Sequence, residues 1–429
     1  MKKILIIFLF LGGCLMSSNI KTVQIKGHDI PIIFESNNFL PIVSMQLVFE
    51  GSGQLSSSHE GVAELASKLL QEGTKKAGSV AFATKLDDKA ITITTHASRE
   101  SFTIEVSSLA TQWDDAISLL KELLQDPNYS TDVLDRIKRQ KIGQIARREA
   151  DFDYIASVNL RKTLFQGTPL ARDLEGTRES VQQITLKDIE DFIATKLGYN
   201  NLVVVIGGDI TLEKAKENTK QIASLLPKVT PFVLPTIEAT NKELDVAIEQ
   251  NDTQQAYIYF GAPFDFSYQE EGQFKARIAE FILGGGGFGS RIMEEIRVKR
   301  GLAYSAYGTL PRTKMVSYLS GYMQTKLENE KKAKELIKEV ISDFATKGIT
   351  QQELDDAKEF LIGSEVLRVE TLRQRLLRAY SEYYYGKPLG FTKKDLDNIA
   401  TVTLEEMNEF IKNHTEITKI SFATVTKNK

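Results

Sequence analysis

One order of strand-like and helix-like segments occurs twice in this chain, and that repeat constrains its fold more than any other feature. In each part, runs of alternating apolar residues precede an amphipathic helix, a hairpin pattern, several long helices and a closing strand. The period of about 210 residues indicates a duplicated domain rather than a solenoid. The pattern therefore predicts an α+β fold with two homologous halves, each an antiparallel sheet with helices packed on one face.

Local periodicity locates the individual elements. Between residues 61 and 71, apolar residues recur three and four positions apart, as on one face of an α-helix. Two alternating stretches, 91–98 and 102–109, predict a β-hairpin. We expect further helices at 113–124, 131–149, 155–165, 271–283, 330–347, 351–366 and 371–384, and further strands at 22–25, 31–35, 43–50, 202–207, 255–260, 302–310, 316–324 and 420–425.

The length and composition agree with two globular domains. A chain of 429 residues exceeds one ordinary core and fits two domains of about 200 residues. We expect an N-terminal domain at 19–226, a proline-punctuated linker at 227–241 and a C-terminal domain at 242–429. The net charge of −3, without a basic block, argues against a nucleic-acid partner.

The N-terminus reads as a targeting segment over residues 1–18. Lys2 and Lys3 precede a short apolar run, 4–11, which is too short to span a bilayer. Leu11-Gly12-Gly13-Cys14 resembles a bacterial lipobox, in which the cysteine is lipidated. We therefore expect an exported protein that is lipid-anchored to a bacterial membrane through Cys14. The alternative is an ordinary signal peptide with a chance cysteine. The single cysteine excludes an intrachain disulfide.

Four consecutive glycines separate two helix patterns in the second half: Gly284, Gly285, Gly286 and Gly287. The Lys-Ser/Thr pair that follows the glycines of a phosphate-binding loop is missing from this stretch. We therefore interpret the run as a sharp helix-to-helix connection and not as a nucleotide site.

Beyond the glycines, Arg297 and Tyr304 lie seven residues apart. Gly301 follows a Lys/Arg-rich turn and predicts the end of the helix between them. If the two side chains converge, this turn must bring them together. Taken singly, Arg297 is typical of a surface ion pair with Glu294 or Glu295, and Tyr304 of a half-buried strand residue.

This part of the sequence resembles the C-terminal half of the pitrilysin/mitochondrial-processing-peptidase family, the inverted zincins. The resemblance rests on the glycine turn, Ser290-Arg291, Arg297 and Lys299-Arg300-Gly301-Leu302-Ala303-Tyr304-Ser305. The resemblance covers essentially the whole mature chain. It implies two homologous α+β halves. It also implies that Arg297 and Tyr304 bind the substrate backbone beside a zinc ion that the other half of the site holds.

The zinc motif of that family, H-x-x-E-H, is altered in this chain. Glu64 and Lys68 stand at the two histidine positions, and Ser67 stands at the glutamate position. The further glutamate ligand aligns with Gln144, with Glu149 nearby. A lysine ammonium would repel Zn²⁺, and a serine hydroxyl cannot replace the glutamate as general base.

No other zinc or nucleophile motif is evident in the sequence. The four histidines, His28, His59, His96 and His414, are never paired at helical spacing, and no Gly-x-Ser-x-Gly elbow or Cys/His pair is found. We therefore expect no bound cofactor or metal and no peptide hydrolysis by this chain alone.

Two-chain members of the family divide the site between a zinc-bearing subunit and an Arg/Tyr-bearing subunit. The resemblance therefore implies a non-catalytic subunit of a heteromeric zinc metallopeptidase, whose zinc-bearing paralogue acts with it on a peptide substrate. Two alternatives stay open, namely a non-enzymatic scaffold of the same fold and a peptide-binding lipoprotein that uses an exposed sheet edge.

Two further clusters indicate structural roles. The tyrosines at 380, 383, 384 and 385 lie near a helix end, and we expect them to pack against a sheet or a domain interface. The basic run at 136–148 is interleaved with isoleucines, so we expect it to form the solvated face of a long helix.

Overall fold

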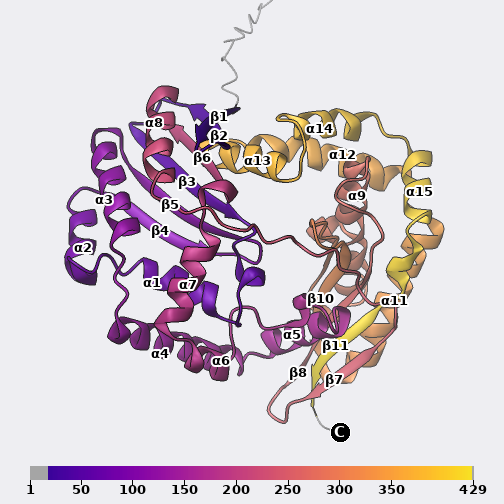
Figure 1. Ribbon diagram of the computed structural model, residues 1–429. Helices are drawn as coiled ribbons and strands as arrows, with labels where there is room; N and C mark the ends of the chain where they lie inside the picture. Colours follow the sequence, from indigo (N-terminus) through magenta and orange to yellow (C-terminus); the bar gives the residue numbers. More distant parts are fainter. Residues whose placement is uncertain (1–17, 428–429) are drawn as a thin grey trace, which may run out of the picture.

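The computed structural model describes residues 18–427, so Cys14 and the expected targeting segment lie outside the described residues. The chain forms two αβ halves that face each other (Figure 1). This confirms the predicted fold class of two homologous halves. The strands are β1 (Asn19–Ile25), β2 (His28–Ser36), β3 (Ile42–Glu50), β4 (Thr92–Ala97), β5 (Ser101–Leu109), β6 (Leu202–Gly208), β7 (Asp245–Glu249), β8 (Gln255–Pro263), β9 (Ala303–Thr309), β10 (Tyr318–Lys326) and β11 (Ser421–Thr426).

The strands form one sheet in each half. The first sheet has the order β1-β2-β6-β3-β5-β4, and the second has the order β7-β11-β8-β10-β9. Most neighbours are antiparallel, and the expected hairpin forms between β4 and β5. Each sheet also contains one parallel pair, β2 with β6 and β7 with β11. Strand β9 lies at an edge of the second sheet, next to β10.

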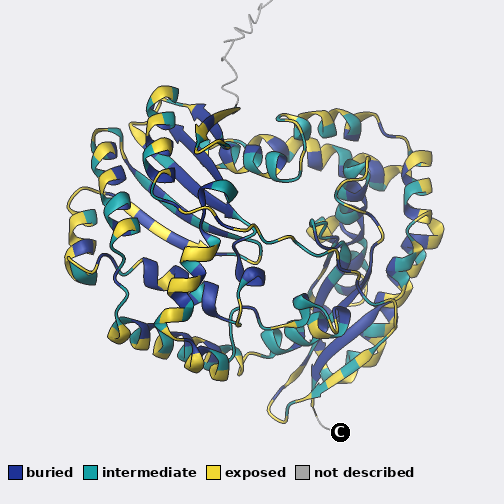
Figure 2. Cartoon of the chain, in the orientation of Figure 1, coloured by how far each residue is buried: buried dark blue, intermediate teal, exposed yellow. Residues whose placement is uncertain are grey.

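Helices cover the outer face of each sheet, and the buried residues lie between the two layers (Figures 1 and 2). The first half buries one apolar face of the helix predicted at 61–71 against its sheet. The helices are α1 (Val62–Leu70), α2 (Gly78–Asp87), α3 (Trp113–Gln125), α4 (Thr131–Arg148), α5 (Phe152–Leu164), α6 (Arg178–Gln183), α7 (Leu186–Lys196), α8 (Leu212–Ala223), α9 (Gln273–Glu280), α10 (Arg291–Met293), α11 (Glu330–Lys347), α12 (Gln351–Gly363), α13 (Leu372–Tyr384), α14 (Phe391–Thr401) and α15 (Leu404–Lys412).

The inner face of each sheet is covered by a helix from the other half. Helix α5 packs on β8 and β11 of the second sheet, where a Cβ at Gly261 would lie 2.7 Å from Leu164 Cδ1. Helix α13 packs on the first sheet, where Leu376 and Ala379 join a buried cluster with Val205. Helix α5 of the first half therefore covers the second sheet, and helix α13 of the second half covers the first sheet. This reciprocal packing interlocks the two halves.

Polar contacts join the same interface. Arg375 on α13 forms an ion pair with the buried Glu35 at 2.7 Å, and the Tyr380 hydroxyl donates to Glu50 at 3.4 Å. Tyr380 and Tyr383 also pack against the apolar cluster on the first sheet. The prediction that these tyrosines pack against a sheet or domain interface is confirmed. Within residues 18–427, no helix combines the length and apolarity needed to cross a bilayer.

Candidate functional site

The residues at the former zinc-motif positions come together in a pocket between α1 and α4. Glu64 and Lys68 lie one turn apart on α1, and Gln144 faces them from α4 across a cavity of about 140 Å³. Ser67 is fully buried and does not line this cavity, and its hydroxyl donates to the Glu64 carbonyl at 2.8 Å. The structure therefore brings Glu64, Lys68 and Gln144 together around one cavity, without Ser67.

A buried lysine that the sequence reasoning missed holds this pocket together. The Lys141 ammonium lies 2.9 Å from Glu175 Oε2 and 3.7 Å from Glu64 Oε1, and its side chain is only 5% exposed. The prediction that the basic run at 136–148 is a solvated face is therefore wrong at this position. Lys141 lies one turn from Ile137 and Ile145, both buried, and this spacing is the signal that could have placed it inside.

The carboxylate of Glu175 accepts hydrogen bonds from Lys141 and also from Arg148. Burial raises the pKa of the Glu175 carboxyl, but the hydrogen bonds and charges of Lys141 and Arg148 outweigh it. The pKa is therefore lowered below its ordinary value. Glu175 remains ionised, and together with Glu64 it balances the buried ammonium.

The side chains of this pocket do not fit a zinc ion. Zinc in proteins is held by imidazole, thiolate and carboxylate ligands. Glu64 and Glu72 offer carboxylates, of which Glu72 is paired with Arg136, whereas Lys68 and Lys141 offer ammonium groups that repel a divalent cation. Among residues 18–427, no group of three or more His, Cys, Asp or Glu side chains is placed to hold a metal.

The four histidines lie in separate places. The rings of His59 and His414 contact Ser58 and Glu416 at 3.0 and 3.2 Å. His28 packs edge-on against the Tyr199 ring in the first half, and His96 lies on the edge strand β4. The fold therefore does not gather these imidazoles into one site.

In the second half, the glycine run connects α9 to α10, as predicted. The chain continues from α9 as a π-helical turn, Phe281–Gly285, and then as a 3₁₀ turn, Gly287–Gly289. A Cβ at Gly284 would lie 2.3 Å from the Gly308 nitrogen, so only glycine lets this turn approach β9 so closely. Gly287 has φ +60°, which glycine adopts without strain.

Arg297 and Tyr304 converge through the turn at Gly301. Helix α10 continues as a π-helical segment, Glu294–Val298, and Gly301 then adopts φ +57°. The Gly301 N–H donates to the Arg297 carbonyl at 3.0 Å, which closes the helix end. Strand β9 begins two residues later, at Ala303. Its pairing with β10 shifts register between residues 323 and 325 of β10, and Tyr304 lies opposite this irregularity with its side chain exposed.

The Arg297 guanidinium lies between two exposed rings. Its Cζ is 4.4 Å from the centre of the Tyr304 ring and 4.6 Å from that of Phe288. The acid Glu295 binds Lys299 and Arg300 instead, so Arg297 is not in the surface ion pair that its charged helix suggested. The Tyr304 side chain is 82% exposed and not half-buried. The two side chains are therefore brought together, with Arg297 half-buried and Tyr304 exposed.

Comparison with known proteins identifies the fold family. Residues 32–178 match the family model described as insulinase (peptidase family M16), and residues 183–361 match the model described as peptidase M16 inactive domain. Over its full length, the chain is 41% identical to a Helicobacter pylori protein named non-peptidase homolog YmxG, of which it covers 99%. The chain belongs to the M16 peptidase family.

Solved structures of similar proteins share the M16 architecture. The M16 inactive domain from Pseudomonas fluorescens superposes with a TM-score of 0.87 at 24% identity, covering 96% of this chain and 98% of that one. A protease from Helicobacter pylori gives a TM-score of 0.82 at 14% identity, covering 95% of this chain and 100% of that one. At these identities the likeness shows the fold.

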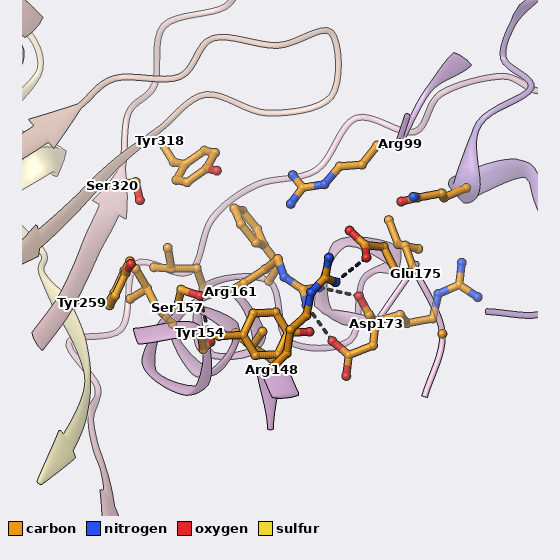
Figure 3. A pocket seen from close by; sticks show the side chains of 18 residues that line it. Arg99, Arg148, Tyr154, Ser157, Arg161, Asp173, Glu175, Tyr259, Tyr318 and Ser320 are labelled. Atoms are coloured by element: carbon orange, nitrogen blue, oxygen red, sulfur yellow. Dashed lines mark hydrogen bonds and ion pairs between the residues drawn. The ribbon is translucent and has the colours of Figure 1, made fainter. Parts of the chain in front are cut away.

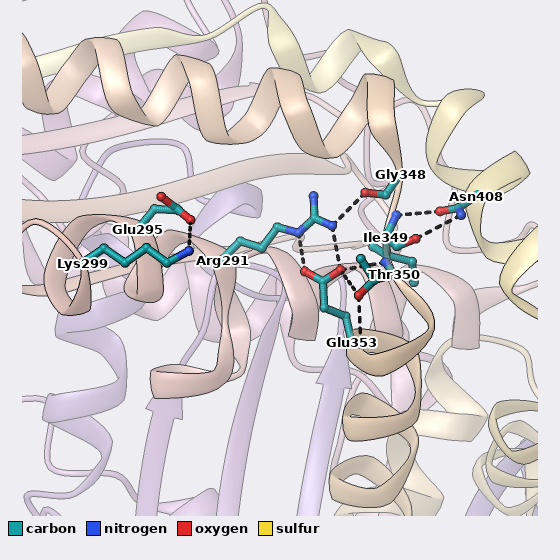
Figure 4. A network of polar contacts seen from close by, with 8 residues as sticks. All are labelled: Arg291, Glu295, Lys299, Gly348, Ile349, Thr350, Glu353 and Asn408. Carbon is teal, nitrogen blue, oxygen red and sulfur yellow. Dashed lines mark hydrogen bonds and ion pairs between the residues drawn. The ribbon is translucent and has the colours of Figure 1, made fainter.

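In this M16 chain, the helix that leads to Arg297 is anchored to the start of α12 (Figure 4). Arg291 donates to both carboxylate oxygens of Glu353 at 2.5 and 2.7 Å and to the Gly348 carbonyl at 2.8 Å. Glu353 also accepts from the Thr350 N–H, completing a capping box at the helix start. This bidentate ion pair between Arg291 and Glu353 fixes the segment that carries Arg297. The sequence reasoning did not identify Arg291 as an anchor.

Proposed function

We propose that this chain is the non-catalytic subunit of a heteromeric zinc metallopeptidase. It would supply Arg297 and Tyr304 to a family paralogue that carries H-x-x-E-H and holds the zinc ion. One observation carries the proposal: the Arg/Tyr pair is assembled, with Tyr304 exposed and Arg297 half-buried, whereas the Lys141 ion pairs occupy the former zinc pocket.

The assembled pair suits a peptide substrate chemically. The planar guanidinium of Arg297 can donate parallel hydrogen bonds to a peptide carbonyl. The Tyr304 hydroxyl can donate to the oxyanion that forms on that carbonyl during attack. Tyr304 belongs to β9, and Arg297 stacks on its ring; β9 is an edge strand that can pair with an extended peptide. Binding and charge stabilisation are the tasks that these two residues would perform.

The surroundings of the pair suit a partner subunit. Phe288 is 65% exposed and Val298 54% exposed, and both lie on the connection and the helix that carry Arg297. Exposed apolar side chains around an arginine and a tyrosine are typical of a surface that another protein covers. A zinc-bearing paralogue seated here would bring its metal to the substrate that Arg297 and Tyr304 hold.

The proposal is tested by reconstitution with the zinc-bearing paralogue of the same organism. Peptide cleavage is measured for each chain alone and for the mixture, with wild-type, Arg297→Ala and Tyr304→Phe chains. We expect cleavage only in the mixture, and each variant should lower turnover by about 10²–10³-fold, as for loss of one oxyanion donor. Arg300→Ala, a neighbouring exposed arginine, is the matched control. Full activity of both site variants would refute the assigned role.

A non-enzymatic scaffold is the second candidate, because the exchanged helices and the ion-paired pocket hold this M16 fold together without a metal. A scaffold would co-purify with its partner, yet Arg297→Ala and Tyr304→Phe would leave every measured activity of the assembly unchanged. A peptide-binding lipoprotein would bind peptides without any zinc-bearing partner. The reconstitution experiment therefore separates the three functions.

We also propose that the protein is exported and anchored to a bacterial membrane through a lipid on Cys14. The basic start, apolar run and Leu-Gly-Gly-Cys sequence support this localisation. Metabolic labelling with an alkyne fatty acid should mark the wild-type protein and not Cys14→Ser. Absence of label on the wild-type protein would contradict the proposal.

A further inference from the structure

A cavity of about 290 Å³ lies between the two halves (Figure 3). The end of α4, helix α5 and the segment at 172–176 form one side of the cavity, and β8 and β10 of the second sheet form another. Figure 3 shows the Arg99 side chain pointing into the cavity, with Tyr318 and Ser320 on the opposite wall. This cavity adjoins the former zinc pocket through Glu175, which pairs with Lys141, but the two have different lining residues, and neither Arg297 nor Tyr304 lines the cavity.

The lining of the cavity has an excess of positive charge. Four arginines line it and two carboxylates, Asp173 and Glu175, accompany them, so four positive minus two negative charges leave +2. Two of the arginines are paired: Arg161 donates to Asp173 at 2.8 Å, and Arg148 donates to Glu175. These ion pairs fix the wall of the cavity and neutralise both carboxylates.

The other two arginines are available to a ligand. Arg99 and Arg172 are exposed, and within residues 18–427 their guanidinium groups have no hydrogen-bond or ion-pair partner. A guanidinium presents a planar fork of donors that matches a carboxylate or a phosphate. The cavity therefore offers two guanidinium groups that can bind an anion, beside two arginines that are already paired with carboxylates.

The rest of the wall is apolar and hydroxyl-bearing. Leu160, Leu164 and Phe165 line the α5 side, and Phe165 packs edge-on against the Tyr318 ring. Such a wall suits an apolar side chain attached to the anionic group. A volume of about 290 Å³ can hold one or two amino-acid residues. An inorganic anion would leave most of this apolar wall uncovered.

A row of tyrosines connects the cavity with the edge strand that carries Tyr304. Tyr259, which lines the cavity, packs on Tyr322 with ring centres 4.9 Å apart. Tyr322 packs on Tyr307 of β9 at 5.5 Å. These rings lie on the inner face of the second sheet and lead from β9 to the cavity. An extended peptide held at β9 can follow this aromatic surface inward.

We propose that this cavity binds the C-terminal carboxylate of a peptide through Arg99 and Arg172, with the last side chain against Leu160 and Phe165. The inference rests on the proposed peptide-binding function and adds a substrate class, namely peptides with a free carboxyl terminus. Arg148 and Arg161 position the wall through their ion pairs and do not need to contact the ligand.

The test measures binding to the chain alone, so it does not depend on reconstitution with the partner. Fluorescence anisotropy compares two labelled peptides of identical sequence with an apolar last residue, one with a free carboxyl terminus and one amidated. We expect the free acid to bind about tenfold more tightly, as for one charge-assisted hydrogen bond. Arg99→Gln with Arg172→Gln should abolish this preference.

Two controls separate this site from the rest of the molecule. Arg139→Gln removes an exposed arginine of α4 that does not line the cavity, and it should leave the preference intact. Arg297→Ala should also retain it, so a failure here is distinguishable from a failure of the proposed subunit role. The inference is overturned by equal affinity for the acid and the amide, by a preference that survives the double variant, or by inorganic phosphate displacing the acid at equal concentration.

Discussion

The former zinc pocket of the first half and the Arg/Tyr pair of the second half differ in what satisfies their charges. In the first half, the Lys141 ammonium is buried and binds Glu64 and Glu175 of the same chain. In the second half, the Arg297 guanidinium lies against the rings of Phe288 and Tyr304 and is in no ion pair within residues 18–427, and Tyr304 is exposed. A buried charge needs a partner of opposite sign within the fold, whereas a half-buried guanidinium without an acidic partner keeps hydrogen-bond donors that a ligand could use.

The largest expected effect is on zinc affinity, when the zinc motif of the family is introduced into this chain. Glu64→His, Ser67→Glu, Lys68→His and Gln144→Glu together should fail to create a tight zinc site, because the Lys141 ammonium still lies in the pocket. Adding Lys141→Met should raise the zinc affinity by about 100-fold, the scale of a change beside a metal ligand. Isothermal titration calorimetry measures both variants. Equal affinities would show that Lys141 does not close the pocket.

Loss of Lys141 should have the next largest effect. Lys141→Met leaves the partly buried Glu64 carboxylate without its cation, so the free energy of unfolding should fall by about 2 kcal/mol. This value lies below the range for a fully buried pair because Glu175 retains Arg148. Urea denaturation measures the change, and Lys141→Met with Glu64→Gln should recover part of it. A variant as stable as the wild type would contradict the structural role of Lys141.

The matching change in the second half should be nearly silent in the isolated chain. Arg297→Ala removes contacts with two exposed rings and breaks no ion pair, so the free energy of unfolding should change by at most about 0.5 kcal/mol. The same urea denaturation measures it alongside Lys141→Met. A loss as large as that of Lys141→Met would mean that Arg297 also serves the fold.

The smallest expected effect is on the pH dependence of stability. The pKa of Glu175 is lowered in the folded chain from an ordinary value of 4.5. The unfolded chain therefore binds more protons as the pH falls below 4.5, and the stability that this carboxylate contributes is lost through the lower, folded pKa. Glu175→Gln should flatten the acid limb of the unfolding midpoint against pH. Parallel curves for the two proteins would refute this.

Local periodicity predicted most elements and failed where tertiary contacts decide the structure. The spacing of Val62, Leu65 and Leu69 is sufficient to define α1, because one face of that helix is buried. Helix α2 was missed, since Phe82 is its one buried residue. The exchange of α5 and α13 is invisible in local patterns, because each helix buries its apolar face against strands of the other half.

The site was predictable to a similar degree. The positions of Glu64, Lys68 and Gln144 followed from the family motif, and the structure places them in one pocket. Spacing alone could not bring Arg297 to Tyr304, because the closing turn depends on the φ of Gly301. Lys141 was missed because a lysine within a basic helix usually faces solvent.

The decisive experiment measures the zinc content and the peptide cleavage of the purified chain, alone and after mixing with the proposed zinc-bearing paralogue. We expect that the chain alone holds no stoichiometric zinc and cleaves no peptide, whereas the mixture cleaves peptides. A chain that retains stoichiometric zinc through dialysis and cleaves peptides without its partner would contradict it.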